Sequence, residues 1–262
     1  MKKLLPVIMA VLMSTALHAQ VTGNLLWEKW NGSMTLAQLS EAQNPDETTL
    51  VYELGNQNNG DNYMSRITGY IVPPATGAYT FYVASDDDSE FWLSTDYTRD
   101  HKTRLCHVPE YASYFNFTKY PEQTSDSIFL IAGESYYFEL LHHEGTGGDH
   151  AEVAWTQPGE SAGTKNIIGT GSISQTPNDD ASLKNILHFT FRDMTYEAFY
   201  NIDRVQHTID VDVAYAYDVT SLVADIVVSS GATISPATGT PLDYTNPVTF
   251  TITAADNSTQ DY

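Results

Sequence analysis

The amino-acid sequence predicts an all-β protein with two domains. Short runs in which apolar and polar residues alternate recur along most of the 262 residues, and glycine and proline separate them. Only one short segment, residues 36–42, has the pattern of a helix. Short strands separated by turn residues at regular intervals are typical of β-sandwiches and barrels.

The first 19 residues have the pattern of a signal peptide. Lys2 and Lys3 precede an apolar run, residues 4–13, that is too short to span a bilayer. Small residues near Ala19 offer a cleavage position before Gln20, and no cysteine follows that would carry a lipid anchor. We expect an exported protein, secreted or periplasmic, with no membrane insertion once the signal is removed.

The strands of a first domain are predicted within residues 21–158. A turn at 73–77 leads into an apolar run at 77–84. Residues 127–131 and 135–142 have the pattern of a hairpin around a turn at 132–134, and residues 151–155 alternate as a third strand.

A change of composition marks the rest of the chain. Residues 159–182 are rich in Gly, Ser, Thr, Asn and Asp and are predicted to be a linker with one brief strand at 166–168. Residues 183–262 are predicted to form a second β-domain, with alternating strands at 207–213 and 247–253 and turn-forming residues at 234–241. The pattern at 195–202 also permits a helix.

The charge balance excludes several classes of partner. The formal net charge is −21, which argues against binding to nucleic acid or to an anionic membrane surface. It suits cation binding. The lone Cys106 rules out an intramolecular disulfide, and we expect its side chain to be buried.

The most informative segment is Ser85–Glu90, which contains Asp86, Asp87 and Asp88 between two apolar runs. Adjacent carboxylates at a strand end repel one another unless a cation holds them. Hard oxygen ligands of this kind suit calcium, which takes six to eight of them. A plain solvated turn is the alternative, because Asp favours turns on its own account.

The first domain resembles the PA14 family, which is named after the fourteen-kilodalton fragment of anthrax protective antigen. The order and spacing of several segments agree over nearly the whole domain. These segments are Leu26–Trp30, Arg66–Tyr70, Pro74–Phe81, Ser85–Ser94, Ala132–Tyr137 and His143–Trp155.

The resemblance implies a β-sandwich of the kind found in adhesins, glycosidases and toxins. In sugar-binding members such as yeast flocculins, two adjacent aspartates joined by a cis peptide hold a calcium ion that coordinates two sugar hydroxyls. Asp86 and Asp87 match that pair, which leaves Asp88 facing solvent.

The resemblance also implies a second calcium loop at residues 144–149. Glu144 and Asp149 are its candidate metal ligands, and Gly147 and Gly148 are candidate sugar contacts together with Asp86 and Asp87. Glycines let the backbone approach an ion closely. A glycine-rich hairpin loop without an ion is the alternative.

The second domain is similar to an immunoglobulin-like module of secreted Bacteroidetes-type proteins, which implies a Gram-negative source. Residues 186–189, 234–239 and 248–259 carry this resemblance. The module normally adds one strand after a tyrosine placed like Tyr262, so we expect this domain to be incomplete. The full fold prediction is a PA14-type sandwich, a linker and a small immunoglobulin-like sandwich.

Other chemistry-bearing residues have simpler interpretations. His142 and His143 point to opposite faces of a strand, so they and His150 are interpreted as surface or packing residues. Trp92 and Trp155 are expected in the core. An exposed aromatic of the connection before Pro121 is a candidate for lining a sugar site. Four aromatics lie there: Tyr111, Tyr114, Phe115 and Phe117.

The sequence predicts an exported, non-catalytic, calcium-dependent carbohydrate-binding protein, such as an adhesin or glycan-recognition protein. Its partner is a glycan or glycoprotein, within a secreted or cell-surface assembly. Glu134 and Glu139 do not suggest a glycosidase pair, because nothing in the pattern sets them across a cleft. Two alternatives stay open: a non-catalytic accessory part of a glycoside hydrolase, and a surface spacer without a ligand.

Overall fold

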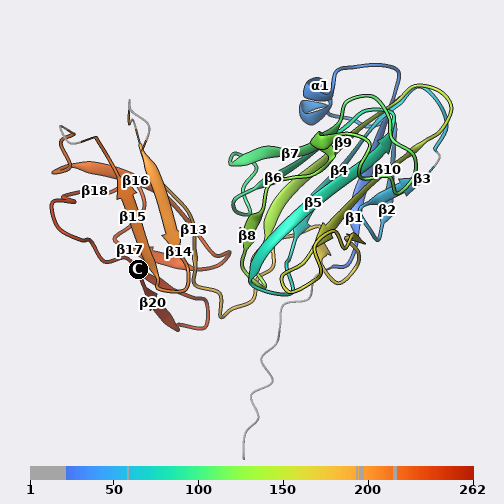
Figure 1. Ribbon diagram of the computed structural model, residues 1–262. Helices are drawn as coiled ribbons and strands as arrows, with labels where there is room; N and C mark the ends of the chain where they lie inside the picture. Colours follow the sequence, from blue (N-terminus) through green and yellow to red (C-terminus); the bar gives the residue numbers. More distant parts are fainter. Residues whose placement is uncertain (1–21, 58, 193, 195–197, 215–216) are drawn as a thin grey trace, which may run out of the picture.

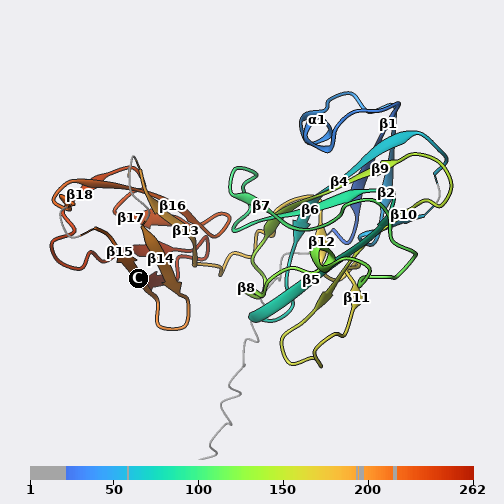
Figure 2. The same ribbon diagram turned by 45° about the horizontal axis from the view of Figure 1, so that its top comes forward.

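The computed structural model describes residues 22–57, 59–192, 194, 198–214 and 217–262. The predicted signal peptide, residues 1–19, lies outside them. Figures 1 and 2 show two β-domains side by side, the first coloured blue to yellow and the second orange to red. In the described part of the chain, no helix combines the length and the apolar character that crossing a membrane requires.

The first domain is a sandwich of two antiparallel sheets, as predicted. Along the larger sheet the strands pair in the order β2-β1-β4-β9-β6-β7, and β12 also pairs with β4. The bounds of these strands are β1 (Leu25–Asn31), β2 (Glu47–Val51), β4 (Tyr63–Ile71), β6 (Ser89–Ser94), β7 (Lys102–Val108), β9 (Tyr136–Glu144) and β12 (Ile173–Ser174).

The smaller sheet has the order β11-β10-β5-β8, and β3 also pairs with β10. Alternating side chains of both sheets fill the space between them, and the rings of Phe81, Phe91, Phe138 and Trp155 form part of this core. The strands of this sheet are β3 (Gly55–Gln57), β5 (Gly77–Asp86), β8 (Ile128–Leu130), β10 (His150–Thr156) and β11 (Asn166–Ile167).

Two short helical segments accompany the sheets. The predicted helix is confirmed as α1 (Leu36–Glu41), and a capping box between Thr35 and Gln38 fixes its start. A 3₁₀ turn, η1 (Pro121–Gln123), follows the long connection after β7. Cys106 of β7 is buried, as expected.

The predicted hairpin of residues 127–131 and 135–142 is wrong. Both segments are strands, but β8 pairs with β5 and β9 pairs with β4 and β6. The turn at Ala132–Glu134 therefore carries the chain from one sheet to the other. A local turn signal does not distinguish a hairpin from such a crossing, because both need the same residues.

The predicted linker is folded onto the first domain over part of its length. The expected brief strand is present as β11, which pairs with β10, and β12 extends the pairing to β4. Ile168 and Ile173 of this segment are buried in the core of the first domain.

The second domain has three small sheets, β13-β16-β18, β14-β15 and β17-β19-β20, around an apolar core that contains Phe189, Phe191 and Phe250. The pattern at 207–213 is confirmed, because Ile209 and Val211 pack on this core while Thr208 and Asp210 are exposed. Its strands are β13 (Ile186–Phe191), β14 (Phe199–Asp203), β15 (Thr208–Asp212), β16 (Leu222–Val228), β17 (Thr233–Ser235), β18 (Pro241–Leu242), β19 (Thr251–Thr253) and β20 (Thr259–Asp261).

Two expectations for this domain need correction. Residues 199–203, where a helix was allowed, form strand β14; residues 195–197 lie outside the described part. The strand predicted at 247–253 is limited to β19, residues 251–253.

A buried carboxylate joins the two domains. Glu134, which lies just before β9, is 1% exposed. It accepts hydrogen bonds from Ser229 Oγ at 2.5 Å and from Asn185 Nδ2 at 2.8 Å, both in the second domain. Burial raises the pKa of this carboxyl group, against the opposing effect of these two hydrogen bonds.

The core of the first domain allows a matched test of packing. Phe138 is fully buried, whereas Phe129 of β8 is 46% exposed. We expect Phe138→Ala to lower the free energy of unfolding by about 3–5 kcal/mol and Phe129→Ala to change it by less than about 0.5 kcal/mol. Urea denaturation followed by tryptophan fluorescence measures this domain alone, because all four tryptophans lie in it. Equal losses for the two variants would contradict the described packing.

Candidate functional site

Two connections that cross between the sheets lie side by side at one end of the sandwich. The turn after β5 carries Asp86 and Asp87 to β6, and the loop of residues 144–149 leads from β9 to β10. In the strand registers, His150 is opposite Asp86 and Ser89 is opposite His142. The fold therefore brings together the two segments that the sequence predicts as a site.

Direct contacts hold the two connections together. The backbone N–H of Gly145 donates to Asp87 Oδ2 at 2.8 Å, and His142 Nε2 lies 2.9 Å from the carbonyl oxygen of Asp86. The peptide bond between Asp86 and Asp87 is cis, as the resemblance implies.

The glycines of the loop make room for the aspartate side chains. A Cβ atom at Gly145 would lie 2.8 Å from Asp87 Oδ2, and one at Gly148 would overlap the carboxylate of Asp86. Contacts this short do not occur for real side chains, so both positions require glycine in this arrangement. Gly147 and Gly148 are exposed at the tip of the loop.

Glu144 is buried in this site without a hydrogen-bond partner. Its side chain is 0% exposed, and neither carboxylate oxygen has a partner among the described residues. Burial, followed by repulsion from Asp149, Asp87, Asp86 and Asp61, raises the pKa of Glu144 to about 8. A buried charged group normally has a compensating partner. This carboxylate needs a cation or a proton.

Asp149 lies next to Glu144 and is anchored by a third loop. Its Oδ1 accepts from the hydroxyl of Tyr63 at 2.7 Å, and its Oδ2 accepts from the backbone N–H of Asn59. One ligand atom each from His142, Glu144 and Asp149 lie within 4.8 Å of one another. The interpretation of His142 as a packing residue holds in part, because its buried ring also borders the acidic site.

The donors in this site fit a hard divalent cation. Burial and the neighbouring Asp87 raise the pKa of Asp86. None of the ion pairs among the described residues involves Asp86, Asp87, Glu144 or Asp149. Several carboxylates therefore converge without a paired Lys or Arg. Their oxygen atoms form the kind of ligand set that Ca²⁺ prefers.

Asp88 is placed differently from the expectation. It does not simply face solvent, because its side chain is 34% exposed and its Oδ1 lies 2.7 Å from Nδ1 of His143. Asp88 therefore points away from the site and pairs with the outward-facing histidine of β9.

Sequence reasoning missed the third loop of the site. The carboxylate of Asp61 accepts from the N–H of Gly147 at 3.4 Å, and the N–H of Asn62 donates to the carbonyl of Gly145 at 2.6 Å. The polar run Asn59-Gly60-Asp61-Asn62 before a strand was the available signal. It was uninformative alone, because its proximity to residue 144 arises only from the pairing of β4 with β9.

Three aromatic residues lie beside the site in the connection after β7. Tyr111, Tyr114 and Phe115 are 49%, 46% and 51% exposed. Tyr111 forms an isolated bridge with Asp86, and the ring of Tyr114 meets that of His150 edge-on at 5.4 Å. Phe117, the fourth candidate, is buried against Tyr82 and is not part of this surface.

The remaining candidates have structural partners. Trp155 is in the core, as expected, whereas Trp92 is half-buried under Lys102. His150 is buried and contacts Glu152 and the carbonyl of Ala112. Glu139 binds Arg99 and Lys102 and Glu134 binds the second domain, so these two carboxylates do not form a catalytic pair.

The raised pKa of Glu144 predicts a pH dependence in the presence of a chelator. Folding favours the protonated form, so this contribution to stability is complete below the usual pKa near 4.5 and is lost as the pH rises toward 8. The slope is at most about 1.4 kcal/mol per pH unit. Denaturation curves between pH 5 and 8 should show it for the wild type and not for Glu144→Gln. Parallel curves for the two proteins would contradict it.

Curated relatives match part of the chain. A mouse protein described as N-acetyl-beta-glucosaminyl-glycoprotein 4-beta-N-acetylgalactosaminyltransferase 1 is 40% identical over 147 residues, which are 53% of this chain and 14% of that protein. Mouse fibrocystin-L is 29% identical over 126 residues, 48% of this chain. The chain spans only 3% of fibrocystin-L, so it covers a small part of both relatives.

Two solved structures are similar at low sequence identity. The PA14 sugar-binding domain from an RTX adhesin is 12% identical with a TM-score of 0.44, over 59% of this chain and 99% of that one. The epithelial adhesin 9 A domain from Candida glabrata, in complex with Galβ1-3GlcNAc, is 12% identical with a TM-score of 0.43, over 63% and 96%.

Two protein families account for the two domains. The family described as "SGBP, N-terminal" matches residues 186–262, in agreement with a separate second module. The family described as "PA14 domain" matches residues 22–166, which are more than half of the chain. This range contains every residue of the candidate site. The chain therefore belongs to the PA14 family.

Proposed function

We propose that this protein is an exported, non-catalytic, calcium-dependent carbohydrate-binding protein. The observation that carries the proposal is Glu144, a buried carboxylate without a partner among the described residues, surrounded by Asp86, Asp87 and Asp149. A site with this much uncompensated negative charge is stable only if a cation or protons neutralise it. Calcium is the abundant extracellular cation that suits such oxygen donors.

Asp86, Asp87, Glu144 and Asp149 are the residues that would hold the ion. Bound calcium supplies coordination positions for neighbouring hydroxyl groups of a sugar. The chain itself orients the donors: Gly145 donates to Asp87, and Tyr63 and Asn59 fix Asp149. Donors held in this way before binding cost little ordering entropy when the ion arrives.

The surroundings of the site suit a sugar. The exposed Gly147 and Gly148 carry no side chains that would cover the carboxylates. Tyr111 forms a backbone bridge with Asp86, and Lys119 Nζ lies over its ring. Further along the same connection, the exposed ring of Phe115 lies against that of Tyr114 and offers a flat apolar surface on which the apolar face of a sugar ring packs. Membership in the PA14 family, some of whose members bind sugars through such an aspartate pair, supports the same function.

The three consecutive aspartates provide a matched test of the calcium ligands. We expect Asp86→Asn and Asp87→Asn to weaken calcium-dependent glycan binding by at least about tenfold, because calcium affinity depends on the number of charged ligands. Asp88→Asn should bind as the wild type does, since Asp88 pairs with His143 outside the site. A glycan array with calcium and with chelator identifies the sugar, and calorimetry on the best ligand then compares the variants.

Glycan binding by Asp87→Asn in chelator at the wild-type level would contradict the proposal. So would an equal loss for Asp88→Asn, since that would point to general damage to the turn. A thermal-unfolding midpoint that does not rise with calcium would exclude an ion bound by the native state.

The exposed aromatics predict a second effect on the same binding. We expect Phe115→Ala to weaken glycan affinity by about three- to tenfold, the range for one aromatic packing contact. Phe129→Ala removes a similarly exposed ring from β8 and is the control. The calcium affinity of both variants should be unchanged, so calorimetry with calcium alone separates loss of sugar packing from loss of the ion. Unchanged glycan affinity in Phe115→Ala would remove this ring from the sugar site.

A further inference from the structure

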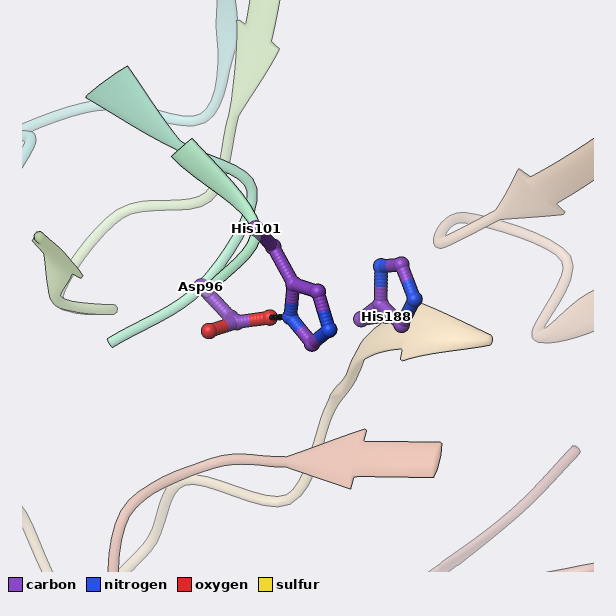
Figure 3. A group of neighbouring side chains, drawn as sticks. All are labelled: Asp96, His101 and His188. Atoms are coloured by element: carbon purple, nitrogen blue, oxygen red, sulfur yellow. Dashed lines mark hydrogen bonds and ion pairs between the residues drawn. The ribbon is translucent and has the colours of Figure 1, made fainter. Parts of the chain in front are cut away.

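A second group of metal-ligating side chains lies where the two domains meet. Asp96 and His101 belong to the connection between β6 and β7 of the first domain, and His188 belongs to β13 of the second. Figure 3 shows the imidazole rings of His101 and His188 facing each other, with Asp96 on the far side of His101. The acidic site is at the opposite end of β6, so the two groups are separate.

The three side chains are close and ordered by contacts. One ligand atom from each lies within 4.8 Å of the other two. The two rings stack with centroids 3.8 Å apart and planes inclined by 8°. Nδ1 of His101 is 2.6 Å from Asp96 Oδ2, and the other carboxylate oxygen accepts from the N–H of Thr98 at 2.6 Å. Asp96 is 0% exposed, so this is a built arrangement and not a chance meeting of surface groups.

Packing alone does not explain this arrangement well. Among the described residues, the ring of His188 has one long hydrogen bond, 3.4 Å from Nδ1 to Oγ1 of Thr95. Aliphatic or aromatic side chains are enough for an interface that needs only apolar contact. Here a buried carboxylate and two imidazoles converge instead. Two imidazoles and one carboxylate form a ligand set that suits zinc and related transition metals.

We propose that Asp96, His101 and His188 bind one divalent transition-metal ion of the zinc type, which ties the two domains together. Zinc bonds of about 2.0–2.2 Å in tetrahedral geometry set ligand atoms roughly 3.3 Å apart. A zinc ion lies in the plane of each imidazole that binds it, so ion binding requires the two stacked rings to turn out of their parallel arrangement. It also requires Asp96 to exchange its hydrogen bond with His101 for a bond to the ion. Three protein ligands leave the fourth position to water. Because His188 alone comes from the second domain, ion binding and domain contact are coupled.

The test is calorimetric titration of the full chain with zinc chloride in saturating calcium, which occupies the acidic site. We expect one zinc per chain, with affinity reduced at least about tenfold in His101→Ala, His188→Ala and Asp96→Asn. His107→Ala removes a β7 histidine outside the group and should bind as the wild type does. Glu144→Gln should also bind zinc normally, because that residue belongs to the acidic site.

A second measurement separates ligation from damage to the fold. Cobalt in place of zinc should give the intense visible absorption of a four-coordinate site in the wild type and in His107→Ala, and not in His188→Ala. Small-angle scattering should show that zinc narrows the distribution of distances between the domains only when His188 is present. Zinc binding unchanged in His188→Ala, or lost only in Glu144→Gln, would overturn the proposal. A wild-type distance distribution that does not change when zinc is added would also overturn it.

Discussion

Uncompensated negative charge at one end of the first domain is the constraint on which the rest of the structure depends. Two buried glutamates of the same strand, β9, show the contrast. Burial alone would raise the pKa of Glu139, but hydrogen bonds from Lys102, Ser40 and Arg99 hold it below its usual value. Glu144 has no such partners among the described residues, and its pKa rises to about 8. The same strand thus carries one carboxylate neutralised by the chain and one that requires a partner from outside it.

The sandwich keeps these carboxylates together by register rather than by local sequence. Asp86 ends β5, Asp87 follows it and Glu144 ends β9; the pairings of β5 with β10 and of β6 with β9 bring them together. A shift of one residue in either pairing would turn alternate side chains to the opposite face. The apolar core, including Phe81, Phe91 and Phe138, prevents such a shift, because those side chains would then leave the interior. The packing of the core therefore also fixes the positions of the carboxylates in the site.

Features that depend on short sequence patterns, or on the resemblance to the PA14 family, could be predicted from the sequence. The aspartate pair, the glycine loop, the helix at residues 36–41 and most strands follow from short patterns. The partners of those strands do not. Residues 127–131 and 135–142 looked like a hairpin, yet they belong to different sheets, because turn chemistry does not specify which strand comes next to which. Asp61 and the contact of His101 with His188 were missed for the same reason, since sequence separations of more than 80 residues carry no local signal.

The placement of the second domain bears on how the first can work. Glu134 precedes β9, and the connection that carries His101 follows β6. The contacts of Glu134 and His101 with the second domain therefore lie at the ends of these strands that are remote from Glu144 and Asp87. At about 3.3 Å per residue, the nine residues of β9 separate the two ends by roughly 30 Å. The second domain therefore contacts the end of the sandwich opposite the acidic site and does not cover that site. A module attached in this way does not cover the acidic end, so the proposed glycan site stays accessible to a large ligand.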